Sequence, residues 1–302
     1  MRVSIWPAAA QPFPDILRIA QHAAATGWHG VWIADHFMPN DGGSAAPDSP
    51  VLEAGSLLAA LAATVPRVRI GSLVYGNTYR HPAVLANMAA TVDRICDGRF
   101  TLGLGAGWQL NEHRQYGIPL PPVGERIDRL AEALQVIRGL LTLPVTTFDG
   151  DHYRLTQARC EPKPVQDPLP LMIGASGEQR MLRLVARHAD QWNCWGLPDL
   201  IAHKSALIDR YCEELGRDPA TIWRTAQAAI VLADSAAGAQ ARIAGLSQPA
   251  FGGPIGQIAE TVARYAENGL DEFIVNTGAL GTGAGLVDVM DLLMAEVFGP
   301  LG

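Results

Sequence analysis

A histidine at the end of a short apolar segment is the first residue whose type could do chemistry. His36 follows Asp35 after the run Gly30-Val-Trp-Ile-Ala. The ordinary pKa of imidazole lies near neutrality, so His36 can give or take a proton, or it can simply bond a neighbouring carbonyl. Successive strand residues point to opposite faces, so Asp35 and His36 can share one side only where the strand has already bent into a loop.

Glycines punctuate a second apolar segment, Phe100–Gly105. A glycine in a strand often marks the close approach of a ligand or of another backbone. The glycine face therefore either opens space for a flat ring or allows tight packing inside the fold, and both interpretations stay open. Because side chains alternate along a strand, one face of this segment carries Thr101, Gly103 and Gly105. The other face carries Leu102, Leu104 and Ala106.

A segment of small residues before a helical pattern could bind an anion. Free backbone N–H groups and the positive end of a helix dipole favour a phosphate at such a place. Ser176 as an ordinary helix N-cap is the alternative, and the loop Gly278–Gly285 is a rival anion site. These residues alone do not decide between them. The segment follows the apolar run Leu169–Ile173 and consists of Gly174, Ala175, Ser176, Gly177 and Glu178.

Other polar and aromatic residues are interpreted as structural. His81 precedes Pro82, which favours a helix-capping role for the histidine. The sequence predicts no metal site, because no pair of histidines has metal-ligand spacing. Four tryptophans are predicted to lie in the core: Trp28, Trp32, Trp192 and Trp195.

Short apolar strands alternate with amphipathic helices along most of the chain, and these elements must position the residues above. Helical patterns include Pro14–Thr26, Leu52–Thr64 and a stripe formed by Leu85, Met88, Val92 and Ile95. Eight segments are predicted as strands: Arg2–Trp6, Gly30–Asp35, Val68–Val74, Phe100–Gly105, Leu169–Ile173, Gln191–Trp195, Thr225–Leu232 and Glu272–Asn276.

Eight such units predict one domain, residues 1–302, folded as an α/β TIM barrel with its site at the carboxyl ends of the strands. A doubly wound open sheet is the alternative. Its glycine-rich fingerprint would follow the first strand, whereas Gly103-Leu-Gly105-Ala-Gly107-Trp108 follows the fourth.

Two stretches depart from plain alternation. Thr146–Tyr153 contains the turn signal Asp149–Gly150 and is predicted as an inserted hairpin. Ser235–Gly253 consists largely of small residues with glycine and proline between them, which predicts a mobile loop. A helical stripe precedes the hairpin and consists of Ile127, Leu130, Leu134, Ile137 and Leu141.

Composition excludes several classes of protein. The 302 residues are 48% hydrophobic and 18% charged, so most of the chain is expected to fold around a core. The net charge of −7 and the lack of a basic patch argue against a nucleic-acid partner. The apolar segment Ala54–Pro66 is too short to span a bilayer, and the sequence predicts no signal peptide. Four widely spaced cysteines fit free thiols in the cytoplasm.

Four motifs in a fixed order give the chain a resemblance to a known family. Together they resemble the luciferase-like monooxygenase superfamily, in its branch of coenzyme F420-dependent oxidoreductases, over nearly the whole chain. The motifs are Gly30-Val-Trp-Ile-Ala-Asp35-His36; Ile70-Gly-Ser-Leu-Val74 with Asn77-Thr-Tyr-Arg-His-Pro82; Gly103-Leu-Gly-Ala-Gly-Trp108 with Asn111-Glu112-His113; and Ile173-Gly-Ala-Ser-Gly-Glu178.

The resemblance implies a β/α barrel with insertions, often dimeric, with a deazaflavin across the barrel mouth. It implies that Asp35 and His36 lie beside the ring and that Asn111 lies near the coenzyme tail. It also implies a bulge with a cis peptide at Leu73–Val74 and a phosphate at Gly174–Glu178, which selects that loop over its rival. The residues that the resemblance places at the ring further include Ser72, Leu73, Val74, Gly105, Ala106 and Gly107.

The chain also departs from the family pattern. Sugar-phosphate dehydrogenases of the family carry a glutamate where this chain has Trp108, and a tryptophan where it has Asn40. The resemblance therefore implies that the acid of their proton-transfer pair is missing here and that the substrate differs.

The leading hypothesis is a cytoplasmic, homodimeric F420-dependent oxidoreductase that acts on a small organic substrate. A hydride would pass between C5 of the deazaflavin and an alcohol, ketone or activated alkene, while His36 exchanges the accompanying proton. A deazaflavin lacks the nitrogen that forms a peroxyflavin, so dehydrogenation or reduction is expected instead of oxygenation. The alternatives are an FMN-dependent monooxygenase on the same fold and a catalytically silent barrel that binds a flavin or deazaflavin.

Overall fold

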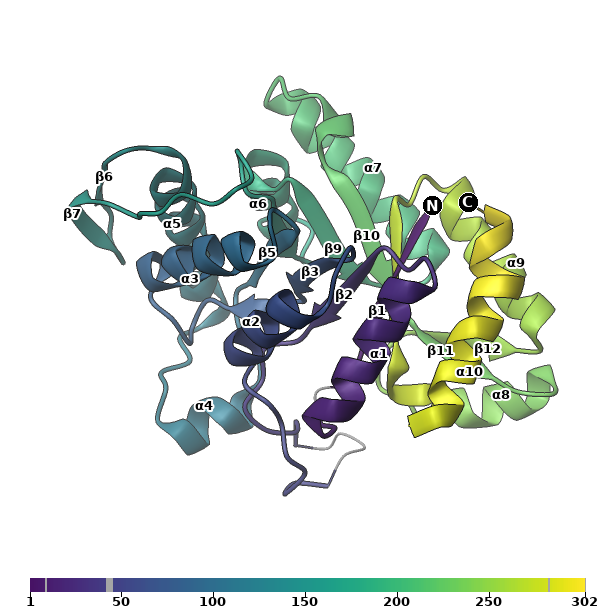
Figure 1. Cartoon of the computed structure of the whole chain (residues 1–302). Helices are drawn as coiled ribbons and strands as arrows, with labels where there is room; N and C mark the ends of the chain where they lie inside the picture. Colours follow the sequence, from purple (N-terminus) through teal and green to yellow (C-terminus); the bar gives the residue numbers. More distant parts are fainter. Residues whose placement is uncertain (9, 42–45, 282, 302) are drawn as a thin grey trace.

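Eight parallel strands form a closed barrel at the centre of the molecule (Figure 1). The computed structural model describes residues 1–8, 10–41, 46–281 and 283–301. Strand β1 pairs in parallel with β13, which joins the last barrel strand to the first and confirms the predicted α/β TIM barrel. In order round the barrel the strands are β1 (Arg2–Trp6), β2 (Gly30–Ile33), β3 (Arg69–Ser72), β5 (Phe100–Gly105), β8 (Leu171–Gly174), β9 (Gln191–Trp195), β10 (Trp223–Gln227) and β13 (Glu272–Asn276).

Amphipathic helices cover the outside of the barrel (Figure 1). In α5 the predicted stripe from Ile127 to Leu141 is buried. In α3 the prediction that Ile95 belongs to the apolar stripe is wrong, since Ile95 is 45% exposed. At 100° per residue it lies about 120° round the helix from Ala89, which is at the middle of the buried face. The helices are α1 (Phe13–Ala25), α2 (Ala54–Thr64), α3 (Pro82–Ile95), α4 (Leu110–Tyr116), α5 (Val123–Thr142), α6 (Met181–His188), α7 (Pro198–Glu214), α9 (Ile255–Glu267) and α10 (Gly283–Leu293).

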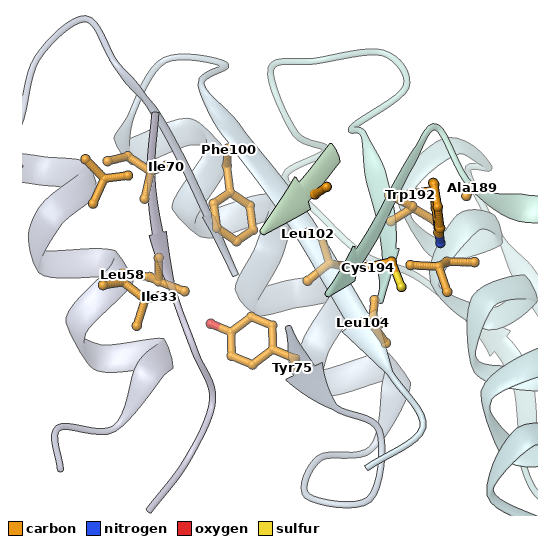
Figure 2. Packing of buried hydrophobic residues seen from close by; sticks show 14 of the residues in the cluster. Ile33, Leu58, Ile70, Tyr75, Phe100, Leu102, Leu104, Ala189, Trp192 and Cys194 are labelled. Atoms are coloured by element: carbon orange, nitrogen blue, oxygen red, sulfur yellow. The ribbon is translucent and has the colours of Figure 1, made fainter. Parts of the chain in front are cut away.

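The main hydrophobic core lies between the barrel strands and these helices. Because side chains alternate along a strand, every second apolar residue points outward into this layer. On β5 the outward residues are Leu102 and Leu104, so the prediction for that face is confirmed. Figure 2 shows part of this layer, with Ile33, Leu58, Ile70, Phe100, Leu102, Leu104 and Trp192 among the residues drawn.

A second, smaller cluster fills the inside of the barrel and consists of Trp32, Leu73, Met172 and Ile274. The Trp32 indole N–H donates to Glu272 Oε1 at 2.9 Å. Gly71 makes room for this indole, since a Cβ at that position would lie 2.2 Å from the ring. These side chains therefore form a packed plug inside the barrel, below its mouth.

The predicted hairpin is present as β6 (Thr146–Asp149) and β7 (Arg154–Ala158), paired antiparallel with each other. Glu132 of α5 anchors its turn. Its carboxylate accepts hydrogen bonds from the backbone N–H groups of Asp151 at 2.9 Å, and of His152 and Tyr153 at 3.0 Å. The hairpin thus adds to α5 instead of to the barrel.

The prediction of a mobile loop at Ser235–Gly253 is wrong. It contains α8 (Ala236–Ile243) and β12 (Ala250–Gly253), and β12 pairs in parallel with β11 (Ala229–Leu232). The Ser235 hydroxyl accepts from Gly238 N at 3.1 Å and so caps α8, whose alanines favour a helix. The predicted strand Thr225–Leu232 is two strands, β10 and β11, separated at Ala228.

All four cysteines are free and buried. Burial raises the pKa of the Cys194 thiol to about 11, so this thiol is protonated at neutral pH and is no nucleophile. Among the described residues, no helix combines the length and the apolar character needed to cross a bilayer.

Candidate functional site

A cavity of about 800 Å³ opens at the carboxyl ends of the barrel strands, which is where TIM barrels carry their sites. Of the site residues predicted from the sequence, three do not line it: Ser72 and Asn111, which are buried, and Glu178, which is exposed. Eleven line it: Asp35, His36, Leu73, Val74, Gly105, Ala106, Gly107, Gly174, Ala175, Ser176 and Gly177.

The floor of the cavity is formed by Leu73 and Val74, which lie above the packed plug of the barrel. The peptide bond between them is cis, as predicted. The flanking glycines of β5 and β8 leave room for Val74: a Cβ at Gly105 or at Gly174 would lie 2.9 Å from a Val74 methyl group. Both interpretations of the β5 glycines therefore apply, since Gly103 packs against Ser72 while Gly105 faces the cavity.

Ser72 holds this floor in place from behind. Its hydroxyl accepts a hydrogen bond from Gly103 N at 2.8 Å and donates to Gly103 O at 3.0 Å. Ser72 is fully buried and does not line the cavity, and its two hydrogen bonds fix β3 to β5.

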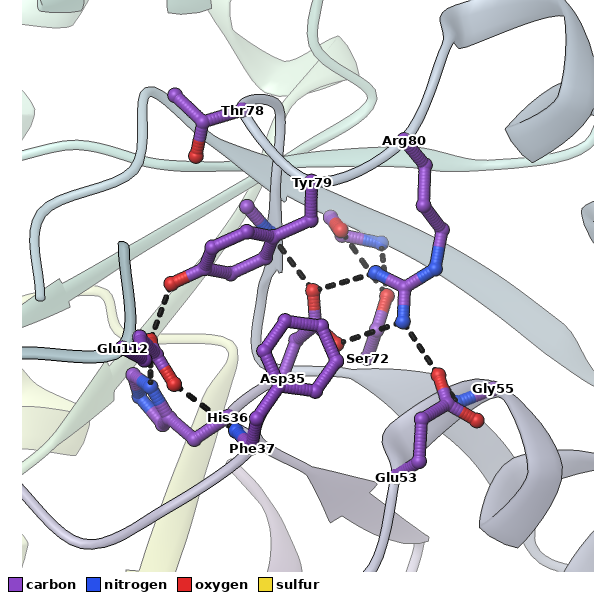
Figure 3. Close-up of polar contacts among 12 residues, drawn as sticks. Asp35, His36, Phe37, Glu53, Gly55, Ser72, Thr78, Tyr79, Arg80 and Glu112 are labelled. Carbon is purple, nitrogen blue, oxygen red and sulfur yellow. Dashed lines mark hydrogen bonds and ion pairs between the residues drawn. The ribbon is translucent and has the colours of Figure 1, made fainter. Parts of the chain in front are cut away.

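Asp35 serves as an anchor rather than as a reacting group (Figure 3). Its carboxylate accepts hydrogen bonds from Arg80 Nη1 at 2.7 Å, from Arg80 Nη2 at 3.0 Å and from Gly76 N at 3.0 Å. Burial raises the pKa of Asp35 even though Arg80 and Gly76 favour the charged form. Arg80 also donates to Glu53, so these contacts join the end of β2 to the segments before α2 and α3.

His36 lies at the cavity wall in a carboxylate–histidine pair that composition and spacing did not reveal. Its Nδ1 lies 2.9 Å from Glu112 Oε1, and its side chain is 26% exposed whereas that of Glu112 is fully buried. Strand β2 ends at Ile33, so Asp35 and His36 already belong to the loop, which is how both can lie at the mouth. Figure 3 shows Glu112 between His36 and Tyr79.

Hydrogen bonds keep Glu112 ionised. Burial opposes its charge, but donors from His36, Phe37 N at 2.8 Å and the Tyr79 hydroxyl outweigh it and lower the pKa of this carboxyl. An ionised carboxylate only accepts hydrogen bonds, so His36 Nδ1 must carry the proton. Neutral His36 is thereby left with the lone pair on Nε2, the nitrogen that can act as a base.

The predicted anion loop lies along another part of the cavity. Ser176 is not a helix N-cap, because α6 begins only at Met181. Within the described part of the chain, the backbone N–H groups of Ser176 and Gly177 donate to no other residue. Lys204 reaches this loop from α7, where its ammonium donates to Ser176 O at 2.6 Å and to Glu178 Oε1 at 3.1 Å.

Two further residues that are predicted at the coenzyme tail make contacts within the chain. Asn111 is buried, and its amide donates to Pro39 O at 2.7 Å, so it ties down the loop after β2 and does not face the cavity. Glu178 turns to the solvent side, where it pairs with Lys204 and His203. Of the rival loop Gly278–Gly285, residue 282 lies outside the described residues, and Gly278, Ala279, Leu280 and Gly281 do not line the cavity.

Arg126 faces this part of the cavity from the first turn of α5. Its guanidinium donates to Gly107 O, while its Nε is buried without a partner among the described residues. A guanidinium with an unused N–H beside free backbone N–H groups is suited to an anion.

A model of one protein family, luciferase-like monooxygenase, matches residues 1–272. The chain belongs to this family. It is 37% identical over 177 residues, 57% of the chain, to a protein of Amycolatopsis mediterranei named F420-dependent glucose-6-phosphate dehydrogenase, and the match covers 51% of that protein. The chain spans about half the length of the first curated relatives that it matches.

Solved structures of similar shape agree with the barrel. An F420-dependent secondary alcohol dehydrogenase in complex with an F420–acetone adduct superposes with a TM-score of 0.82 at 20% identity, covering 98% of each chain. The F420-dependent tetrahydromethanopterin reductase from Methanopyrus kandleri gives 0.82 at 15% identity, covering 100% of this chain and 99% of the other. At such identities the likeness concerns the fold.

Several lining residues of this luciferase-like family member were missed by sequence reasoning. Trp195 was predicted to be core but lines the cavity at the end of β9, together with Trp6 at the end of β1. Strand-end position was the signal that could have found them, since the carboxyl ends of all barrel strands meet at the mouth. Gln227 and Asn276 could have been found in the same way.

Proposed function

We propose that this chain is a coenzyme F420-dependent oxidoreductase that moves a hydride between the coenzyme and a small organic alcohol, ketone or activated alkene. The observation that carries the proposal is the ionised Glu112 behind His36 at the wall of a barrel-mouth cavity. The named F420 dependence of the relatives in Amycolatopsis mediterranei and in the solved structures supports the choice of coenzyme.

The residues present fit a deazaflavin and its phosphate. The floor at Leu73 and Val74, with glycines on both sides, offers an apolar surface without projecting side chains. The unused Nε of Arg126 and the free N–H groups of Ser176 and Gly177 would hold the phosphate. The cavity of about 800 Å³ falls within the range of ordinary cofactor sites.

When bound, the coenzyme would supply a carbon centre that accepts or gives a hydride. His36 Nε2 would take the hydroxyl proton as an alcohol carbon loses its hydride, or return that proton to the oxygen in the reverse direction. Glu112 would hold the imidazole in the tautomer that makes Nε2 the base and would stabilise the imidazolium that forms. Positioning by the cavity walls would reduce the entropy cost of bringing donor and acceptor together.

Trp108 bears on the substrate. The family resemblance places it where sugar-phosphate dehydrogenases have their acid. Trp108 is 58% exposed, and its ring meets the His36 ring edge-on with centroids 5.5 Å apart. Glu112 does not replace that acid, because it binds Nδ1 on the buried side of His36. We therefore propose a substrate other than a sugar phosphate.

Titration of the purified protein with F420, FMN and NADP, read by quenching of its tryptophans, tests the proposal. We expect F420 to bind in preference to FMN and NADP, and alcohols or enones from a panel to change the redox state of bound F420. His36→Ala should lower turnover by about 10²–10⁴ without loss of coenzyme binding. His152→Ala, on the hairpin turn, is the matched control.

Binding of FMN but not F420 would replace the proposal with the monooxygenase hypothesis. Binding of F420 without any redox change across the panel would favour the silent barrel. Full turnover by His36→Ala would remove the proton-carrier role from this residue.

We further propose that the protein works in the cytoplasm as a homodimer. Exposed apolar side chains gather on and beside α4, where Leu110 is 74% and Tyr116 is 59% exposed, and such side chains favour an interface. Sedimentation of the protein and of a Leu110→Asp variant tests this: the parent should sediment as a dimer and the variant as a monomer.

A further inference from the structure

The cavity has a second half that the proposed coenzyme contacts do not use. It is built at the ends of β1, β9, β10 and β13, four strands that are neighbours in the barrel. The coenzyme floor, in contrast, lies at the ends of β3, β5 and β8. The second half, here called the tryptophan subsite, is lined by Trp6, Trp195, Gln227 and Asn276.

Aromatic surface dominates the tryptophan subsite. The Trp6 and Trp195 rings meet edge-to-face, with centroids 5.7 Å apart and planes at 61°. His36 and Trp108 line the same cavity from the loops after β2 and β5. Rings at this separation leave apolar faces for a ligand, and burial of such faces favours a ligand with an apolar body.

The tryptophan subsite carries no net charge to bind an ion. Among the described lining residues, Arg126 is the one with a guanidinium or ammonium group, and it lies on α5, where it donates to Gly107 O. The Asp35 carboxylate forms an ion pair with Arg80. A phosphate or carboxylate in this half would lose its hydration without gaining a cation, which is costly.

One polar group in the tryptophan subsite lacks a partner. Gln227 is 3% exposed, and its side-chain Oε1 has no hydrogen-bond partner among the described residues. Its side-chain NH₂ group donates to none of the described side chains or carbonyls. Its polar neighbours each make a side-chain hydrogen bond: Asn276 Oδ1 accepts from Gly278 N at 2.9 Å, and Asn193 Nδ2 donates to Thr225 Oγ1 at 2.8 Å. A buried amide without a partner is costly to the fold, so a ligand that bonds it would gain affinity.

We propose that the tryptophan subsite selects an uncharged, mainly apolar alcohol or ketone, and that Gln227 bonds a second oxygen of that substrate. This inference rests on the proposed function and makes its substrate class specific. The body of the substrate lies against Trp6 and Trp195, and its reacting oxygen lies toward His36. Charged substrates such as sugar phosphates are excluded by the lack of a cation in this half of the cavity.

Three cyclohexanones of similar size separate the parts of this proposal. They are 4-hydroxycyclohexanone, which offers a second oxygen, 4-methylcyclohexanone, which does not, and anionic 4-oxocyclohexanecarboxylate. Each is titrated against the His36→Ala variant loaded with oxidised F420, because the parent could oxidise the hydroxyl group of 4-hydroxycyclohexanone, and Gln227→Leu is compared in the same background. Glucose 6-phosphate is a further charged ligand. We expect the hydroxyketone to bind most tightly and the two anions to bind at least about tenfold more weakly.

Gln227→Leu is the decisive variant. It should weaken binding of 4-hydroxycyclohexanone about five- to tenfold, leave 4-methylcyclohexanone unchanged and leave the affinity for F420 unchanged. Its Tm should be equal to or above that of the parent, because the unpartnered amide is removed. Gln240→Leu makes the same chemical change on the exposed side of α8 and should alter none of these affinities.

The proposal is overturned if either anion binds as tightly as 4-hydroxycyclohexanone, or if Gln227→Leu weakens both neutral ketones equally. Failure of the proposed function looks different, because F420 itself then does not bind. In that case the same ketones are titrated against the coenzyme-free protein, and the order of their affinities decides the tryptophan subsite independently.

Discussion

Replacing Glu112 by glutamine tests how His36 is prepared for proton transfer. The carboxylate accepts from three donors: His36 Nδ1, Phe37 N and the Tyr79 hydroxyl. A glutamine of the same shape has one oxygen and one NH₂ group, so it cannot accept from all three. The NH₂ group would face His36 and Tyr79, because beside Phe37 it would meet another N–H donor, and an imidazole that accepts from it must carry its proton on Nε2.

The size of the effect follows from these contacts. Hydrogen bonds to a charged group contribute about 1.5–3 kcal/mol each, so loss of one or two should lower the Tm clearly without preventing folding. The wrong tautomer removes the base, and turnover should fall by about 10²–10⁴. Binding of F420 should not change, because Glu112 does not line the cavity.

Two assays separate this positioning role from a merely structural one. Nitrogen-15 NMR of the histidine rings should show His36 protonated on Nδ1 in the parent and on Nε2 in Glu112→Gln. Steady-state kinetics should show the loss in kcat rather than in KM. Tyr79→Phe, which keeps the carboxylate and its contact with His36, is the control and should retain most of the turnover. Parent-like turnover in Glu112→Gln, or an unchanged His36 tautomer, would refute the reasoning.

Three further variants probe the anion loop and a half-buried histidine. Gly177→Asp should keep the fold, since its Cβ would meet only Met181 at an ordinary 3.6 Å, but should sharply weaken F420 binding in a titration; equal affinity would place the phosphate elsewhere. Lys204→Met leaves Ser176 O without its ammonium donor and should cost about 1–3 kcal/mol in thermal unfolding and weaken F420 binding; no change in either would contradict the role given to Lys204. Burial, together with nearby arginines, lowers the pKa of His188 from its ordinary 6.5 to about 4. As the pH falls, the unfolded chain therefore takes up this proton before the folded chain does, and the free energy of unfolding should decrease between pH 6.5 and pH 4. Chemical denaturation across this range should be flatter for His188→Gln, and an identical slope would be inconsistent with that pKa.

The barrel could be predicted from the sequence because its strands are short, buried and bounded by turns. Phe100–Gly105, Gln191–Trp195 and Glu272–Asn276 match the predicted limits, since buried strands of a parallel sheet have continuous apolar sequence. The segment Ser235–Gly253 was misjudged because alanine and glycine carry no amphipathic pattern, and its capping serine was overlooked. Local pattern is therefore informative where burial is complete and weak where residues are small.

The site was predictable in part, for a related reason. Strand-end glycines and the cis peptide at Leu73–Val74 are local features of single motifs, and both are found at the cavity. The partner of His36 is not local: Glu112 lies 76 residues further along the chain, in the short helix α4. Spacing cannot predict such a contact, and it equally cannot predict the contacts of Asn111 with Pro39 and of Glu178 with Lys204.

A crystal structure of the protein with oxidised F420 would show directly where the coenzyme binds. We expect the deazaflavin ring on Leu73 and Val74, its phosphate between Arg126 and the Ser176–Gly177 backbone, and His36 Nε2 facing the side of the ring toward the tryptophan subsite. A ring bound elsewhere, or a phosphate held at Gly278–Gly285, would contradict this expectation.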